Sequence, residues 1–226
     1  MASKFKVLKL WDCCCLRALP EFPCSGSLEI LDMKSALCFP SDGNDLDFAN
    51  LWNLKVLLMQ NCGVKEMTCS SSRTIGMLHL LPWSLTTLHI NECQKLKCLP
   101  NLENLENLTA LSIHSCPLLK EIIGLGGLKP LKTLSLSFLQ AVPNVDGLDS
   151  LCSLKSLILT HCDALERLPN LAFLGKLLHL DISCCHNLSA IQGLGGLESL
   201  QTHLIDGAKC LTCLLGFETL LSPNKL

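Results

Sequence analysis

Cysteine and histidine are the residues of this 226-residue chain whose types and spacing could support chemistry, and it has 16 and 7 of them. Three short clusters would suit a zinc ion: Cys13-Cys14-Cys15, Cys184-Cys185-His186, and the pair Cys210 and Cys213. A zinc site needs four convergent ligands, usually supplied by two such pairs. The repeat described below assigns Cys13 and Cys185 to the core instead. We therefore predict no metal site.

Two histidine–cysteine neighbours resemble a catalytic base beside its nucleophile. His161 precedes Cys162, and His114 lies two residues before Cys116. A catalytic thiol must be exposed in an electropositive environment, whereas the repeat directs both of these thiols inward. We therefore predict structural cysteines, no catalytic residues and no enzymatic activity.

Glycine clusters around Gly124 and Gly193 resemble phosphate-binding loops. Their glycines, however, alternate with leucines at core positions of the repeat, which favours tight turns. The motif G-x-x-x-x-G-K-[ST] is not matched, because Gly175-Lys176 lacks the upstream glycine and the hydroxyl residue. We predict that the chain binds no cofactor.

Composition narrows the class of protein further. Hydrophobic residues make up 49% of the chain and charged residues 17%, with a mean hydropathy of +0.39, which excludes a disordered chain. A formal net charge of −2 argues against nucleic acid or anionic lipid as a partner. No long apolar run occurs, and Lys4, Lys6 and Lys9 lie where a signal peptide would be apolar. We expect no membrane span and a cytoplasmic or nucleo-cytoplasmic location.

The elements that must position these residues come from a repeat of 23 residues. Units start at positions 85, 108, 131, 154, 177 and 200, with apolar residues at offsets 0, 3, 5, 8, 11, 14, 17 and 20. His203 is the one exception among these six units. The same frame starts near 5, 28 and 54, with inserted loops at about 37–47 and 63–81. A fixed period of this size indicates a solenoid, so we predict one domain of about nine repeats over 1–226.

Each unit should fold as a short strand followed by an irregular return. Offsets 3 and 5 point inward and offsets 4 and 6 outward, which is the alternation of a half-buried strand. Offsets 8 to 20 are apolar at every third residue, which fits 3₁₀ turns or extended coil better than α-helix. The expected fold is an α/β-type solenoid, with a parallel sheet on its concave face and coil or 3₁₀ turns on its convex side.

Offset 8 is a column of cysteines, which we expect to be reduced thiols packed as small apolar residues. Its members are Cys13, Cys62, Cys93, Cys116, Cys162 and Cys185.

The outward side chains of the strands form the candidate partner-binding surface, because exposed apolar residues among polar ones are typical of protein contacts. Its candidate residues are His89, Asn91, His114, Ser135, Phe138, Ile158, His161, His179 and Asp181. A solvent face without a partner is the alternative.

The consensus L-x-x-L-x-L-x-x-C is a form of the leucine-rich-repeat signature. With Leu-Pro at offsets 14 and 15, it resembles the leucine-rich repeats of plant intracellular nucleotide-binding disease resistance proteins. The segments LPWSLTTLHINECQKLKCLPNL and GLGGLESLQ are similar to those of the Toll/interleukin-receptor type. The resemblance implies a recognition and regulatory module for innate immunity and signal transduction. Its partners would be a pathogen effector or guarded host protein, and a neighbouring nucleotide-binding domain.

Two other interpretations stay open. A leucine-rich-repeat substrate adaptor of an F-box ubiquitin ligase would use the same face, and an upstream F-box helix pair would identify it. A truncated, non-functional fragment of a resistance protein would fit the position of the first unit, which begins five residues into the chain.

Overall fold

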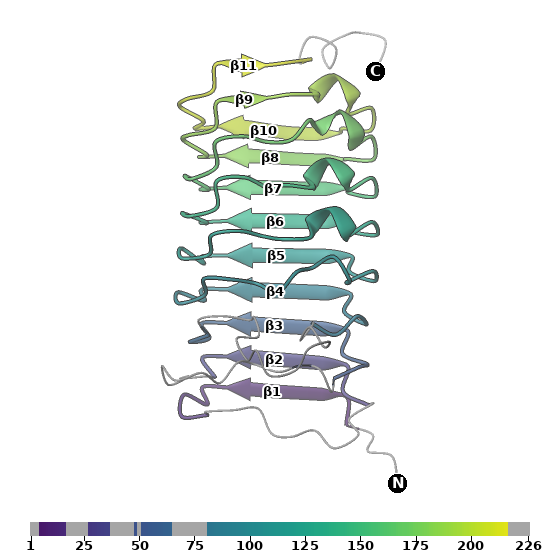
Figure 1. Ribbon diagram of the computed structural model, residues 1–226, viewed down its shortest axis with the longest axis vertical. Coiled ribbons are helices and arrows are strands. Elements are labelled where there is room, and N and C mark those ends of the chain that lie inside the picture. Colours follow the sequence, from purple (N-terminus) through teal and green to yellow (C-terminus); the bar gives the residue numbers. More distant parts are fainter. Residues whose placement is uncertain (1–4, 17–26, 37–47, 49–50, 65–80, 217–226) are drawn as a thin grey trace, which may run out of the picture.

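The computed structural model describes residues 5–16, 27–36, 48, 51–64 and 81–216. Nine strands of five residues form one parallel sheet, ordered β1 to β8 and then β10, and stack in a single column (Figure 1). They are β1 (Val7–Trp11), β2 (Ile30–Lys34), β3 (Val56–Gln60), β4 (Thr87–Asn91), β5 (Ala110–His114), β6 (Thr133–Ser137), β7 (Ser156–Thr160), β8 (His179–Ser183) and β10 (Thr202–Asp206). The predicted parallel-sheet solenoid is confirmed.

The spacing of the strands follows the sequence repeat. From β5 onward each strand of the large sheet begins 23 residues after the previous strand of that sheet, whereas β3 begins 26 residues after β2 (30 to 56) and β4 begins 31 after β3 (56 to 87). The strands pair in register, so Leu88 lies opposite Leu111 and Leu111 opposite Leu134. The predicted insertion at 37–47 lies outside the described residues, as does most of the one at 63–81.

The second and fourth residues of β2 to β8 build the core, whereas those of the end strands β1 and β10 are partly or fully exposed. Leu111, Leu134 and Leu157 have no exposed surface, and neither do the residues two positions after them, apart from 1% at Leu136. Burying one such side chain contributes about 2 kcal/mol. Because each turn covers the leucines of the next, every turn depends on its neighbours for stability.

The return side of the solenoid is irregular, as predicted, and the described residues contain no α-helix. It contains four 3₁₀ helices, η1 (Leu125–Gly127), η2 (Leu148–Ser150), η3 (Leu171–Phe173) and η4 (Leu194–Gly196), and a small parallel pair of β9 (Ala190–Ile191) and β11 (Cys213–Leu214). Gly124 precedes η1 with a φ of 85° and Gly193 precedes η4 with a φ of 82°. These glycines therefore form turns, and Leu125 and Leu194, which follow them directly, are buried.

The cysteine column lies just under the end of the sheet. Cys62, Cys93, Cys116, Cys162 and Cys185 are buried, but Cys13 is only half-buried because it lies in the first described turn. The Sγ of Cys185 is 3.4 Å from the carbonyl oxygen of Leu159, so the thiol acts as a weak donor toward the preceding turn. A hydrogen bond with the Cys116 thiol, together with burial, raises the pKa of Cys93 to about 12. None of the thirteen described cysteines forms a disulfide.

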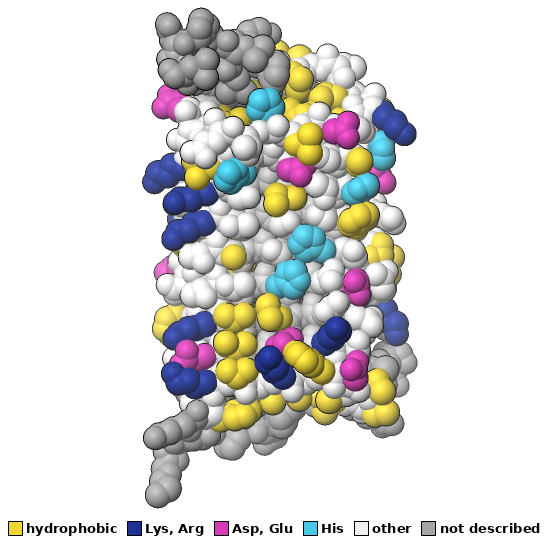
Figure 2. Space-filling view, turned by 180° about the vertical axis from the view of Figure 1, so that it is seen from behind, with side chains coloured by type: hydrophobic (Ala, Val, Ile, Leu, Met, Phe, Trp, Pro, Cys, Tyr) yellow, Lys and Arg dark blue, Asp and Glu magenta, His cyan; other side chains and the backbone are white. Residues whose placement is uncertain are grey.

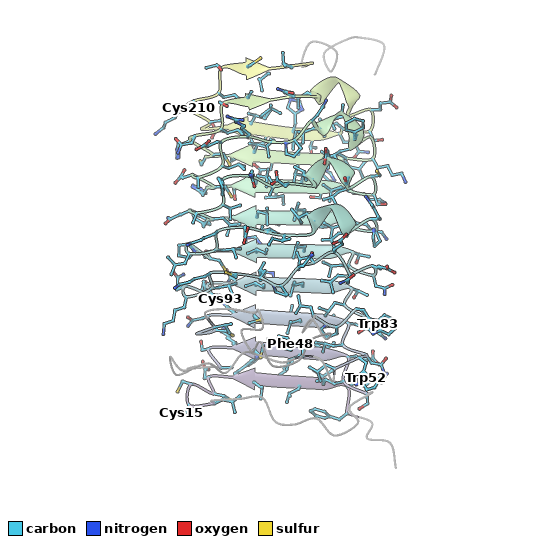
Figure 3. The ribbon with its side chains drawn as sticks, viewed as in Figure 1. Cys15, Phe48, Trp52, Trp83, Cys93 and Cys210 are labelled. Atoms are coloured by element: carbon cyan, nitrogen blue, oxygen red, sulfur yellow. The ribbon has the colours of Figure 1, made fainter. Side chains whose placement is uncertain are left out.

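The three cysteine and histidine clusters that were considered as zinc ligands do not converge in the described part of the chain. Cys15 and Cys210 lie at opposite ends of the stack (Figure 3). Nδ1 of His186 lies 2.6 Å from Oδ1 of Asp163. No group of three potential ligands occurs among the described residues. Within the same residues, no helix is long and apolar enough to cross a membrane.

Candidate protein-docking surface

The sheet face consists of the first, third and fifth side chains of each strand, the residue just before the strand and the residue just after it. The alternation of the strands positions these side chains, since their second and fourth residues enter the core. Figure 2 shows lysine and arginine side chains along one edge of a face that carries histidines in its middle and near the opposite edge.

A turn with left-handed backbone follows eight of the strands. In each turn the residue after the strand has a φ between 49° and 56°, and its N–H donates to the carbonyl at the end of the next strand. The residues are Asp12, Ser35, Asn61, Glu92, Ser115, Phe138, His161 and Cys184. Asn and Asp, and to a lesser extent His, accept this conformation more readily than other residues, whereas a bulky hydrophobic residue in it is strained.

Phe138 is the large hydrophobic residue at this position, and its side chain is 48% exposed. Its ring is stacked on the imidazole of His161 in the next turn, with centroids 4.4 Å apart and an interplanar angle of 7°. A strained, exposed aromatic residue is a candidate for function because another residue would serve the turn better. Sequence reasoning selected both residues, and the structure brings them into contact.

The middle of β6 and β7 is covered by its own side chains. Ser135, a predicted partner-binding residue, lies on the sheet face but is only 7% exposed, so it is not available for contact as expected. The serine side chain is shorter than the side chains around it, which include Ile158 directly opposite on β7. Ser137 is 5% exposed and accepts a hydrogen bond of 2.7 Å from the Thr160 hydroxyl. Ile158 itself is half-buried.

His89 and His114 lie side by side on β4 and β5, with ring centroids 5.6 Å apart and tilted by 41°. Partial burial lowers the pKa of each imidazole, and the neighbouring His89 lowers that of His114 further. Their surroundings therefore favour the neutral form of both rings. Asn91, on the same strand as His89, donates a hydrogen bond to the Glu92 carboxylate.

The predicted residues on β8 are engaged with their neighbours. Nδ1 of His179 lies 2.6 Å from the hydroxyl of Thr202 on β10. Asp181 accepts a hydrogen bond from the Ser183 hydroxyl two residues later on the same strand. The sheet face at β8 is consequently polar and held by internal bonds.

A second apolar region at the start of the sheet was missed by the sequence prediction. Val7 is 41% exposed and Trp11 53% exposed, and the Lys9 ammonium lies 4.9 Å from the Trp11 ring centroid. Ile30 and Val56 continue the row begun by Val7 on the neighbouring strands. The sequence contained the signal for this region, because the outward-facing offsets of the repeat select these same residues when they are applied to the first three units.

No protein-family model and no curated protein matches the sequence. Among solved structures, internalin C2 from Listeria monocytogenes aligns with a TM-score of 0.53 and 22% identity, covering 80% of this chain and 72% of that one. Another internalin from Listeria monocytogenes aligns with a TM-score of 0.39 and 17% identity, over 84% and 74% of the two chains. A leucine-rich-repeat protein from Leptospira interrogans aligns with a TM-score of 0.30 and 15% identity, over 84% and 72%.

Proposed function

Because the chain has the leucine-rich-repeat fold, we propose that it is a protein-recognition module that binds partners through its sheet face. The observation that supports this most is the strained, half-exposed Phe138 stacked on His161. Aromatic side chains carry a large share of the binding energy at protein interfaces. The surface works by complementarity and performs no catalysis.

The more specific proposal is that this module belongs to a plant disease resistance protein of the nucleotide-binding, Toll/interleukin-receptor type. The cysteine column and the Leu-Pro corner at Leu99 and Leu168 support it, since they carry the resemblance. In the cytoplasm the module would sense a pathogen effector or a guarded host protein. Its contact with a neighbouring nucleotide-binding domain would hold the receptor inactive until then.

The decisive experiment begins with the full-length transcript, which identifies the domain encoded beside this chain. Binding of the chain to that domain is then measured for the double variant Phe138→Asp, Ile158→Asp, with Lys120→Asp, at an exposed residue outside the sheet face, as the matched control. Burying the new carboxylates should weaken binding at least tenfold, whereas the control should bind normally. Unchanged binding by the double variant would remove this surface from the function. An F-box helix pair in the transcript would favour the ubiquitin-ligase adaptor.

A further inference from the structure

Strands β6 and β7 carry two lysines at one end and an aromatic pair at the other. Lys132 and Lys155 come directly before the two strands, and Phe138 and His161 directly after them. The lysines occupy neighbouring turns, because the N–H of Lys155 donates to the carbonyl of Lys132 at 2.8 Å. Both lysine side chains are exposed.

The charge of these two lysines is not compensated within the described residues. At the same position of the first three turns, the Glu29 carboxylate lies between Lys6, at 2.7 Å, and Lys55, at 3.0 Å. No such ion pair includes Lys132 or Lys155 in the part of the chain that the structure describes. Like charges on adjacent strands repel each other, so an anion brought to this edge would be stabilised.

The surface between the two ends offers little to a polar ligand. The Ser137 hydroxyl already bonds Thr160, and Ser135 is covered. Ile158 adds an apolar contact at the middle of β7. The groups on these strands that can bind a ligand are therefore the two lysines at one edge, Lys132 and Lys155, and the Phe138–His161 stack.

We propose that β6 and β7 bind an extended acidic peptide segment of a partner protein. Its carboxylates would pair with Lys132 and Lys155, and an aromatic side chain would pack on the Phe138–His161 stack. Phe138 lies six positions after Lys132, which is about 20 Å of extended chain at 3.3 Å per residue. The acidic and aromatic residues of the ligand are therefore about six positions apart. The inference rests on the proposed function and names the chemistry of its partner.

Charge distribution favours a peptide over a single-stranded nucleic acid, which would also offer anions and rings. A protein that binds single-stranded nucleic acid has positive charge along the whole path of the phosphate backbone, whereas these lysines lie at one edge only. The next outward residue beside Ile158 is Asp181, which would repel a phosphate chain. The net charge of the chain is −2.

The test uses the full chain and synthetic octapeptides with Glu-Glu at one end, Trp at the other, and Thr and Gly between them. Both sequence directions are prepared, because the sheet face does not fix the direction of its ligand. Control peptides carry Lys-Lys in place of Glu-Glu, or Ala in place of Trp, and a thymidine octanucleotide represents nucleic acid. Binding is measured by titration calorimetry at low and high salt.

At least one direction of the acidic peptide should bind, and binding should weaken as salt rises. Phe138→Ser should weaken it about tenfold, and this variant should fold because Ser35 and Ser115 occupy the same turn. The double variant Lys132→Glu, Lys155→Glu should abolish the preference for the acidic over the lysine peptide. Lys120→Glu, at an exposed lysine outside the sheet face, is the control and should bind like the native chain.

The inference is overturned if neither acidic peptide binds more tightly than its lysine counterpart, if Phe138→Ser leaves binding unchanged, or if the oligonucleotide binds best. These outcomes are separate from a failure of the proposed function. The peptides can fail while Phe138→Asp with Ile158→Asp still abolishes the contact with the adjacent domain. In that case the surface recognises protein, but not by this chemistry.

Discussion

Gly124 is the position at which the return side should be least tolerant of substitution. The residue has a φ of +85°, and a Cβ placed on it would lie 2.0 Å from Oδ1 of Asn101 and 2.5 Å from the backbone nitrogen of Glu103. These two atoms form a hydrogen bond of 2.9 Å in the turn below. We expect Gly124→Ala to destabilise the fold strongly.

The magnitude follows from two contributions. A residue with a Cβ costs about 1–2 kcal/mol in the left-handed region. Moving Asn101 away breaks its bond to the Glu103 N–H, which costs about 1 kcal/mol more. The sum is about 2–3 kcal/mol of unfolding free energy, which corresponds to a Tm lower by about 4–12 °C in a protein of this size.

Thermal unfolding followed by circular dichroism measures this difference. Gly175→Ala is the matched control, because no atom lies within 4 Å of a Cβ built there. That variant should keep its Tm or raise it slightly, since alanine restricts the unfolded chain. If the two variants melt within about 2 °C of each other, the turn does not need glycine and the reasoning about this corner is wrong.

Three other predictions concern the core, the thiols and the histidines. Leu134→Ala should cost about 3 kcal/mol in urea unfolding because its side chain is fully buried, whereas Leu118→Ala, at a residue 46% exposed, should cost far less. Iodoacetamide followed by mass spectrometry should modify the exposed cysteines of the native chain and spare the buried ones until urea is added. The exposed set includes Cys14, Cys152 and Cys210, and the buried set is Cys62, Cys93, Cys116, Cys162 and Cys185. The pKa values of His89 and His114 in the folded protein lie below the usual 6.5. The free energy of unfolding should therefore be highest above pH 6.5 and decrease as the pH falls through the lowered pKa values. In a His89→Gln, His114→Gln variant this decrease should be smaller.

The strands and the core could be predicted from sequence because their causes are local and repeated. Leu88 and Ile90 point inward because a strand alternates, and the next turn repeats the choice at Leu111 and Ile113. The cysteine column could be predicted in the same way, because its members recur at offset 8 of the repeat. The small pair of β9 and β11 on the return side was not predictable, since it depends on how two turns approach each other.

The binding surface was predictable in outline but not in detail. Serine, asparagine and aspartate at offset 7 were a signal for left-handed turns that could have marked Phe138 as an exception. The stacking of Phe138 on His161 depends on side-chain rotamers that no spacing rule contains. The covering of Ser135 likewise depends on the sizes of side chains in neighbouring turns.

The unbroken register from β4 to β10 allows the length of the molecule to change without changing its parts. Removing 23 consecutive residues that contain one strand joins two ends of equivalent geometry and deletes one turn. Deleting or duplicating the turn of β5 shifts the Phe138–His161 stack relative to His89 by about 4.8 Å, the distance between neighbouring strands. The separation between two contact points on this protein can thus be adjusted in whole steps, as a partner of different size would require.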